Sequence, residues 1–207
     1  MTKIKICGIT NLDDALACLA AGADAVGFVF AQSPRKITPE KAAEICGELS
    51  DSITRIGVFV NENIEAVHQI TSFCGLNLVQ LSGEENGDYW TQLKMPFLKV
   101  FRVKGNFVIG DIERSGLSLF MLDTYSSDKF GGTGNSFDWE IAFQAKKYGN
   151  FFLSGGLTPG NVTVALEEVA PFGVDVSSGV EKCPGKKELD KVKQFIAEVR
   201  KWDSQTN

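Results

Sequence analysis

Two short segments rich in serine and glycine have the composition of phosphate-binding backbone. Gly155 and Gly156 follow one apolar run, and Ser178 and Gly179 follow another further along the chain. Glycine has no side chain, so the backbone at these positions can approach a ligand closely and point its N–H groups at an oxyanion. Two such loops in tandem favour a shared phosphate, whereas either loop alone could be an ordinary turn at the end of a strand.

The second segment also has the spacing of a capping box. Ser178 is followed three residues later by Glu181, the pattern in which a serine and a glutamate satisfy the first N–H groups of a helix. We therefore expect a helix to open at Ser178. The positive end of its dipole would add to the attraction for a phosphate.

Four polar residues that could act on a ligand lie at or near the ends of apolar runs. They are Cys7, Gln80, Asp123 and Asp175. A thiol and a carboxyl group that reach a ligand from different sides suit a general base and a general acid working on different atoms. The alternatives are that Cys7 is a small core residue and that Asp123 only caps a turn at Thr124.

The elements that must position these residues alternate regularly between strand and helix patterns. Predicted strands cover residues 3–7, 25–30, 55–60, 78–81, 97–101, 117–122, 151–153 and 173–176. Predicted helices cover residues 12–21, 39–49, 64–73, 89–93, 108–114, 138–148, 161–169 and 188–201. Asn11 and Thr38 are expected N-caps, with Pro39 at the first helical position.

Eight strand-helix units predict a single α/β domain, a (β/α)8 TIM barrel over residues 1–207. The 207 residues give about 26 residues for each unit, close to the minimum for such a repeat. An open doubly wound sheet also alternates strands and helices, but it carries its glycine-rich phosphate loop after the first strand. Phosphate loops after the seventh and eighth strands instead favour the barrel, with the active site at the carboxyl ends of its strands.

Closing the barrel would bring the first and eighth strands together. Period-two alternation places Lys5 and Cys7 on one face, and Asp175 would then lie near one of them and offset a buried charge. Arg35 follows the second strand in a polar loop, where it is either solvated or placed to bind a carboxylate on the ligand. Residues 131–134, Gly-Gly-Thr-Gly, form either a plain connector or a lid.

Composition narrows the class of partner. The net charge of -5 and the pI near 5.0 argue against a nucleic-acid partner. No apolar run is long enough for a membrane span, and the amino terminus leads straight into a strand pattern, so we expect a cytoplasmic protein. Five scattered cysteines indicate reduced thiols, and the single histidine, His68, gives no basis for a metal site.

The motifs together resemble the phosphoribosylanthranilate isomerase family of tryptophan biosynthesis over essentially the whole chain. They stand in the same order as in that family: Lys5-Ile6-Cys7-Gly8-Ile9-Thr10, Gly22-Ala23-Asp24-Ala25-Val26-Gly27-Phe28, Gly57-Val58-Phe59-Val60-Asn61, Leu122-Asp123, Gly131-Gly132-Thr133-Gly134, Leu153-Ser154-Gly155-Gly156-Leu157 and Val174-Asp175-Val176-Ser177-Ser178-Gly179-Val180-Glu181. One departure is Ser82, in Gln80-Leu81-Ser82-Gly83, where many members carry histidine.

The resemblance implies an Amadori rearrangement of N-(5-phosphoribosyl)anthranilate to its 1-deoxyribulose isomer, without metal or organic cofactor. It implies that Cys7 is the general base, Asp123 the general acid and Arg35 the residue near the anthranilate. Phosphate binding would fall to the two glycine-containing loops, and we assign Gln80 and Asp175 to the substrate site. We expect a small-molecule phosphosugar-anthranilate substrate, no nucleic acid or membrane partner, and a monomer or a homodimer.

The proposed chemistry requires both reacting side chains to be tuned. An ordinary thiol, with a pKa near 8.5, is mostly protonated at pH 7, and an ordinary aspartate, with a pKa near 3.9, is ionised. Burial and neighbouring charges must therefore move both pKa values, and Lys5 is a candidate to help Cys7. Two alternatives to this function remain. The protein could be a different phosphosugar barrel enzyme, such as an epimerase, or a catalytically silent sensor of phosphometabolites.

Overall fold

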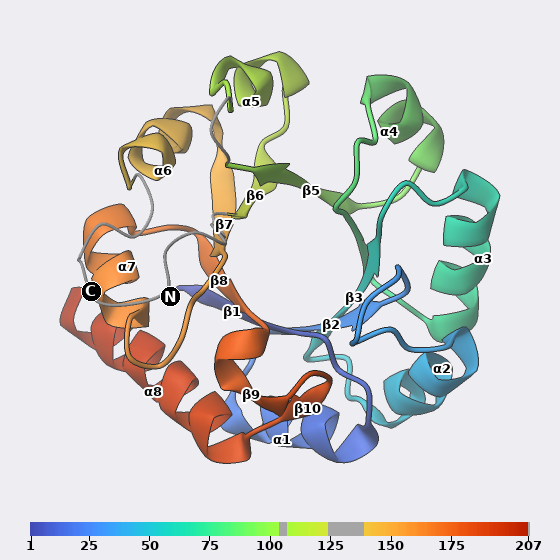
Figure 1. Ribbon diagram of the computed structural model, residues 1–207, viewed down its shortest axis with the longest axis horizontal. Coiled ribbons are helices and arrows are strands. Elements are labelled where there is room, and N and C mark those ends of the chain that lie inside the picture. The colour runs from blue at the N-terminus through green and yellow to red at the C-terminus, as the bar shows by residue number, and fades with distance from the viewer. Residues whose placement is uncertain (104–106, 124–138, 207) are drawn as a thin grey trace.

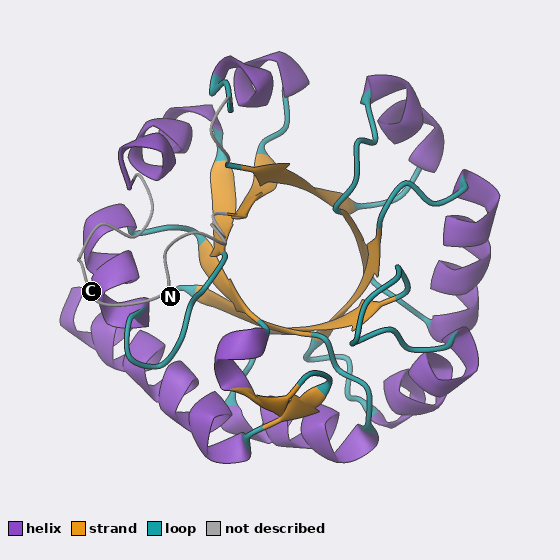
Figure 2. Ribbon diagram, viewed as in Figure 1, coloured by secondary structure: helices purple, strands orange, loops and turns teal. Residues whose placement is uncertain are grey.

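Eight strands, β1 to β8, close into a parallel barrel surrounded by helices (Figures 1 and 2). The structure is a computed structural model and describes residues 1–103, 107–123 and 139–206. Neighbouring strands follow the sequence order around the ring, and β1 pairs with β8 in parallel to close it. This arrangement confirms the predicted (β/α)8 TIM barrel and rules out an open doubly wound sheet.

The strands agree with the sequence-based boundaries to within about two residues. They are β1 (Lys3–Cys7), β2 (Ala25–Val29), β3 (Thr54–Phe59), β4 (Leu78–Leu81), β5 (Phe97–Arg102), β6 (Leu119–Asp123), β7 (Asn150–Ser154) and β8 (Gly173–Val176). The helices around them are α1 (Leu12–Ala21), α2 (Pro39–Glu48), α3 (Ile64–Cys74), α4 (Gly87–Leu93), α5 (Gly110–Ser115), α6 (Trp139–Ala145), α7 (Val162–Val169) and α8 (Leu189–Thr206), with a 3-10 turn, η1 (Lys146–Tyr148), after α6.

Helix starts follow the capping residues that the sequence provides. The side chain of Asn11 accepts a hydrogen bond from the N–H of Asp14, and the side chain of Thr38 accepts one from the N–H of Lys41. Pro39 occupies the first turn of α2, as predicted. Asp138, the expected first residue of another helix, lies outside the described residues.

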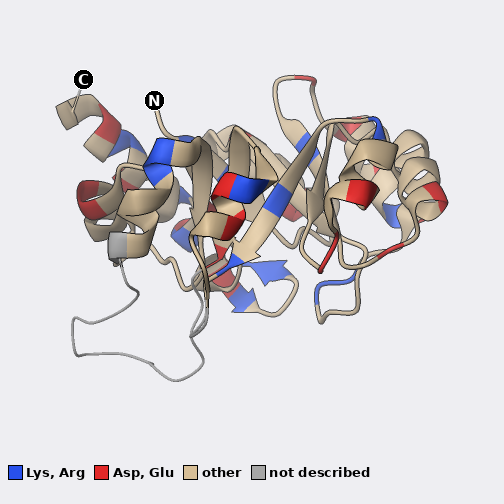
Figure 3. Ribbon diagram, turned by 90° about the horizontal axis from the view of Figure 1, so that it is seen from above, with Lys and Arg blue, Asp and Glu red and all other residues tan. Residues whose placement is uncertain are grey.

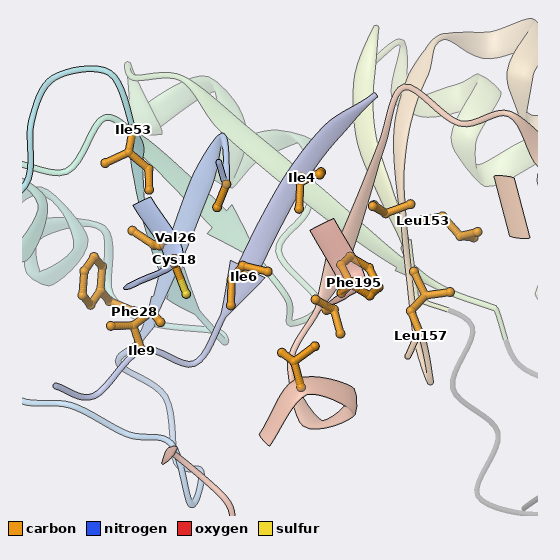
Figure 4. Close-up of a cluster of buried hydrophobic side chains, with 14 of the residues drawn as sticks. Ile4, Ile6, Ile9, Cys18, Val26, Phe28, Ile53, Leu153, Leu157 and Phe195 are labelled. Carbon is orange, nitrogen blue, oxygen red and sulfur yellow. The ribbon is translucent and has the colours of Figure 1, made fainter. Parts of the chain in front are cut away.

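Side chains alternate between the inside and the outside of the barrel along each strand. Those that point outward pack against the helices, and Figure 4 shows part of that layer, with Ile4 and Ile6 of β1 and Phe195 of α8 among its members. Inside the barrel, a second group of apolar side chains fills part of the interior: Leu98, Val100, Met121 and Phe152. The filled interior leaves the carboxyl ends of the strands as the place for a ligand.

The expected helix at Ser178 is absent, and this prediction was wrong. Residues Ser178–Val180 form one 3-10 turn, η2, and Glu181 begins a small antiparallel hairpin of β9 (Glu181–Cys183) and β10 (Lys186–Lys187). The carboxylate of Glu181 does not return to the backbone at Ser178 as a capping box requires. It binds Arg35 and Lys187 instead, because ion pairs to two cations, one of them fully buried, outweigh a single capping bond.

The described part of the chain contains no helix long and apolar enough to cross a membrane. In the side view of Figure 3, acidic and basic residues alternate with other residues along the ribbon and are not separated into different regions. All five cysteines are free thiols, four of them buried, while Cys183 is exposed. His68 is half-buried on α3, and its Nε2 lies 2.6 Å from the carbonyl oxygen of Leu93. The loop at residues 131–134 and the turn proposed at Thr124 lie outside the described residues.

Candidate active site

The side chains of Cys7 and Lys5 approach each other near the carboxyl end of β1, beside a glycine of the neighbouring strand. Both side chains are buried inside the barrel. A Cβ atom placed on Gly27, in neighbouring β2, would lie 2.9 Å from Cys7 Sγ and 3.2 Å from Lys5 Nζ. Gly27 therefore provides the space in which the thiol and the ammonium approach each other.

Asp175 holds the Lys5 ammonium from the other side, as the closure of the barrel predicted. Lys5 Nζ lies 2.6 Å from Asp175 Oδ1, and Ser154 Oγ donates to Asp175 Oδ2 at 3.0 Å. The side chains of Lys5 and Asp175 are almost fully buried, so the opposite charges compensate each other. The chain of contacts from Cys7 through Lys5 and Asp175 to Ser154 joins β1 to β8 and β7.

Burial and charge act in opposite directions on Cys7. Burial raises the pKa of the Cys7 thiol, and the Lys5 ammonium lowers it by a smaller amount, so that the pKa is raised overall. For Lys5, burial lowers the pKa, but Asp175 and Cys7 together outweigh it and the pKa is raised. At neutral pH the pair therefore consists of a neutral thiol beside a charged ammonium.

Asp123 ends β6, on another side of the barrel mouth from Cys7. It is level with Ser154 of β7 and with Arg102 of β5 in the strand register. Alternation along β6 places it on the same face as the buried Met121, which points into the barrel. Because β7 and β8 lie between β6 and β1, Asp123 and Cys7 approach the mouth from different directions.

The two glycine-containing loops form one pocket of about 150 Å³. Its lining consists of Ser154, Gly155, Gly156, Leu157, Asp175, Val176, Ser177 and Ser178. Gly155 and Gly156 both have left-handed φ angles, of 99° and 67°, that favour glycine. A Cβ atom on Gly179 would lie only 1.9 Å from the carbonyl oxygen of Leu157. The loops therefore touch each other at Gly179, which lets them enclose one small volume.

The N–H groups that begin η2 face no partner within that turn. Ser178 and Gly179 are its first two residues, and the early N–H groups of a helical turn have no carbonyl group before them to bind. The pocket thus combines glycine backbone from the loop after β7 with N–H groups from the turn after β8, and this turn is shorter than the predicted helix.

Arg35 lies over the end of β1 and is paired with Glu181. Its aliphatic part covers Gly8, where a Cβ atom would lie 2.6 Å from Arg35 Cδ. Its Nε and Nη2 donate to the two carboxylate oxygens of Glu181 at 2.8 and 2.7 Å. The sequence placed Arg35 near the mouth, but nothing in the local sequence indicated this ion pair with a residue far along the chain.

Gln80 is buried inside the barrel on β4 and is bound to the unusual Ser82. Its Nε2 donates to Ser82 Oγ at 3.1 Å, while its Oε1 is buried without a hydrogen-bond partner in the part of the chain that the structure describes. Arg102 Nη2 donates to the carbonyl oxygen of Ser82 at 2.6 Å. Sequence reasoning missed Arg102, because the predicted strand ended one residue too early. Its alternation with Leu98 and Val100 was the available signal.

The described residues contain no group of three or more His, Cys, Asp or Glu side chains arranged to hold a metal ion.

Lys187, like Arg102, is a residue that the sequence gave no reason to select. It is fully buried, and its ammonium contacts the carbonyl oxygen of Cys7, which is distant in the sequence, as well as Ser177 and Glu181, which lie within ten positions of it.

Comparison with known proteins identifies the family. The family model of N-(5'phosphoribosyl)anthranilate (PRA) isomerase matches residues 4–198. An N-(5'-phosphoribosyl)anthranilate isomerase of Geotalea uraniireducens (strain Rf4) is 47% identical over 201 residues, which cover 97% of this chain and 99% of that protein.

Two solved structures show the same barrel. The phosphoribosyl anthranilate isomerase of Thermotoga maritima has a TM-score of 0.87 and 43% identity, over 97% of this chain and 100% of that one. A phosphoribosyl anthranilate isomerase in complex with reduced 1-(o-carboxyphenylamino)-1-deoxyribulose 5-phosphate has a TM-score of 0.85 and 41% identity over the same shares. With the family model matching nearly the whole chain, this protein belongs to the N-(5'-phosphoribosyl)anthranilate isomerase family.

Proposed function

We propose that this protein isomerises N-(5-phosphoribosyl)anthranilate to 1-(2-carboxyphenylamino)-1-deoxyribulose 5-phosphate, with Cys7 as general base and Asp123 as general acid. The observation that supports this most is the direct connection between the two halves of the site. Asp175 lines the pocket of the glycine-containing loops and also binds Lys5, which meets Cys7. A phosphate held in that pocket would place its sugar within reach of Cys7.

The reaction needs one proton delivered and one removed. Protonated Asp123 donates to the ring oxygen of the sugar, the bond from that oxygen to C1 breaks, and the nitrogen lone pair forms a C1=N iminium. The Cys7 thiolate then takes the proton from C2, the electrons of that C–H bond form a C1=C2 double bond, and the C1=N electrons return to nitrogen, which gives an enolamine. The enolamine gains a proton at C1 as its hydroxyl becomes the ketone at C2. Both residues act only on protons.

Direct turnover is the test of this function. Purified protein is incubated with N-(5-phosphoribosyl)anthranilate, and the product is identified by mass spectrometry and NMR. Formation of the 1-deoxyribulose product supports the proposal. Binding of the substrate without turnover would instead favour the phosphometabolite sensor, and conversion of a different phosphosugar would favour another barrel enzyme.

We also propose how this protein is organised, what it binds and where it acts. Residues 1–207 would form one catalytic domain that uses neither a metal nor an organic cofactor, and that binds its small-molecule substrate without a nucleic-acid partner. It would act in the cytoplasm as a monomer or a homodimer. Sedimentation of the purified protein with and without substrate measures that last property.

Gly179→Ala is expected to raise KM for the substrate by about 10- to 100-fold, with a smaller change in kcat. The added Cβ would meet the Leu157 carbonyl and push the two loops apart, which removes N–H contacts worth about 1.5–3 kcal/mol to a charged phosphate. Steady-state kinetics, with inorganic phosphate as a competitive inhibitor, measure this.

Gly47→Ala is the matched control, because Gly47 lies on α2 with no atom within 4 Å of the added Cβ. Gly156→Ala tests the other loop, where space is open but the left-handed φ of 67° strains an alanine. Unchanged KM and unchanged phosphate inhibition in folded Gly179→Ala would remove the phosphate assignment from this pocket.

Arg35→Lys is expected to raise KM by about 10-fold or more, because lysine keeps the charge but cannot form the two parallel hydrogen bonds of a guanidinium with a carboxylate. The measurement compares binding of the product with binding of an analogue that lacks the anthranilate carboxylate. Wild type should lose affinity for the analogue, and Arg35→Lys should bind both nearly alike.

Arg55→Lys is the control for that substitution, because Arg55 lies near the opposite end of the barrel and contacts Asp51 and Asn77. If Arg35→Lys weakened the product and the analogue equally, Arg35 would not act on the carboxylate.

A further inference from the structure

A buried triad of charges connects Arg35 to the backbone of Cys7. Glu181 accepts from Arg35 with both oxygens and lies 3.0 Å from Lys187 Nζ. The exposed fractions of the Glu181 and Lys187 side chains are only 4% and 0%, against 22% for Arg35. Only the Arg35 end of the triad therefore reaches the open side of the barrel mouth.

Lys187 ties this triad to the reacting strand. Its ammonium donates to the carbonyl oxygen of Cys7 at 2.6 Å and to that of Ser177 at 3.2 Å, in addition to Glu181. An ammonium has three N–H donors, so all three are used. One side chain thus connects the end of β1, the loop that leads into η2 and the carboxylate that holds Arg35.

The charges of the triad require one another. A buried ammonium or carboxylate without a partner is costly, and Glu181 is the only carboxylate that contacts the Lys187 ammonium within the described residues. Burial raises the pKa of Glu181, but Arg35 and Lys187 outweigh burial and lower it, so the carboxylate is ionised at neutral pH. The triad carries a net charge of +1, which it presents to the mouth through Arg35.

Glu181 also determines which edge of the Arg35 guanidinium is available to a ligand. It occupies Nε and Nη2, while Gly8 supports the aliphatic part of the side chain. Within the described chain, Nη1 has no protein acceptor. A planar guanidinium fixed along one edge turns its other edge in a single direction, which suits recognition of a planar carboxylate.

The hairpin that carries these residues has anchors that do not involve Glu181. The N–H of Lys187 donates to Asp14 Oδ2 at 2.8 Å, and the hydroxyl of Thr10 donates to the carbonyl oxygen of Gly185. Asp14 also lies 3.2 Å from Lys186 Nζ. Because α1 and the loop before it hold β9 and β10 in this way, Glu181 can be changed with the hairpin in place.

We propose that Glu181 is a positioning residue for substrate recognition: it orients the Arg35 guanidinium toward the carboxylate of the substrate, and Lys187 couples that orientation to the backbone of Cys7. The inference rests on the proposed function, since it assumes that Arg35 binds the anthranilate carboxylate. It assigns to Glu181 and Lys187 a role that neither the glycine-containing loops nor the acid and base requires.

The test is a double-mutant cycle with Glu181→Gln and Arg35→Ala, followed by KM and kcat for the substrate. Glutamine keeps the shape but loses the charge that holds the guanidinium. Glu181→Gln should raise KM by about 10-fold with a smaller change in kcat, and should add less than about twofold in the Arg35→Ala background, since residues that act through one contact are not additive. Binding of the analogue without the carboxylate should not change.

Asp203→Asn is the control for removing a buried carboxylate. Asp203 binds Thr2 and Arg200 near the amino-terminal end of β1, so its loss can destabilise the fold without touching the mouth. An unchanged KM in Glu181→Gln, or an equal loss with and without Arg35, would overturn the positioning role. If wild type itself gave no product, the proposed function would fail first, so the two failures are distinguishable.

Lys187→Met tests the link to Cys7 through the pH profile. Lys187 lowers the pKa of the Cys7 thiol, so its removal should move the acidic limb of kcat/KM to higher pH. A loss of activity that is the same at every pH would indicate only a structural role and would remove Lys187 from the proposal.

Discussion

Cys7→Ala is expected to lower kcat by roughly 10²–10⁴-fold, the range that a positioned general base contributes, while KM changes little. Alanine removes the proposed proton acceptor at C2 but leaves the proposed phosphate pocket and Arg35 in place. The thiol is small and belongs to a small apolar cluster with Val29 and Val58, so its truncation should not unfold the barrel. Circular dichroism and phosphate inhibition verify that the variant is folded and still binds.

Cys18→Ala is the matched control, because Cys18 is a buried thiol on α1 that packs in the outer core. Its loss should lower stability and leave kcat unchanged. Near-wild-type turnover by Cys7→Ala would end the assignment of Cys7 as base, and a loss of kcat as large in Cys18→Ala would show that both effects arise from packing.

The raised pKa of Cys7 predicts the direction of the pH dependence. A base acts when it is deprotonated, so kcat/KM should rise with pH through the neutral range and level off only above the pKa of an ordinary thiol, about 8.5. Alkylation by iodoacetamide in a Cys183→Ser background reports the same pKa. Burial raises the pKa of Cys18 and Cys46 to about 12 and that of Cys74 to about 11, so these thiols should react far more slowly.

Asp123→Asn is expected to lower kcat by roughly 10²–10⁴-fold for a different reason. The amide has the shape of the carboxyl group but does not transfer a proton to the ring oxygen, so ring opening loses its proposed acid. In wild type the acid must be protonated, which adds a limb where the rate falls as pH rises. That limb should be absent from whatever activity Asp123→Asn retains.

Asp13→Asn provides the comparison, since Asp13 is exposed in the first turn of α1. A substrate that is already ring-opened separates the roles of Asp123 and Cys7 further, because it needs no protonation of the ring oxygen. The open-chain imine, generated in solution, should be converted by Asp123→Asn and not by Cys7→Ala. If both variants failed equally with the open-chain imine, Asp123 would not be confined to ring opening.

The local sequence was sufficient to predict the strands and helices of the barrel, but not the β9–β10 hairpin. Period-two alternation identified β1, and the caps Asn11 and Thr38 fixed where α1 and α2 begin. These features depend on residues within a few positions of one another, so the chain carries them before it folds. Eight such units with glycine-containing loops after the last two strands were enough to predict the barrel and to place Cys7 and Asp123 at its mouth.

Contacts between distant residues could be predicted only where the topology brought them together. The pairing of Lys5 with Asp175 followed from alternation once the barrel was closed between β1 and β8. The net pKa of Cys7 did not, because it depends on how deeply the thiol is buried as well as on the distance to Lys5, and burial outweighs the charge.

The role of Glu181 shows what the tertiary structure alone decided. By spacing it is the last residue of a capping box after Ser178, a local pattern that competes with any partner the fold brings near. The barrel brings Arg35 to it across 146 positions of sequence, and the β9–β10 hairpin brings Lys187 to it across 6. Two cations in a buried site bind a carboxylate more strongly than one backbone N–H does, so the capping box gives way to an ion triad.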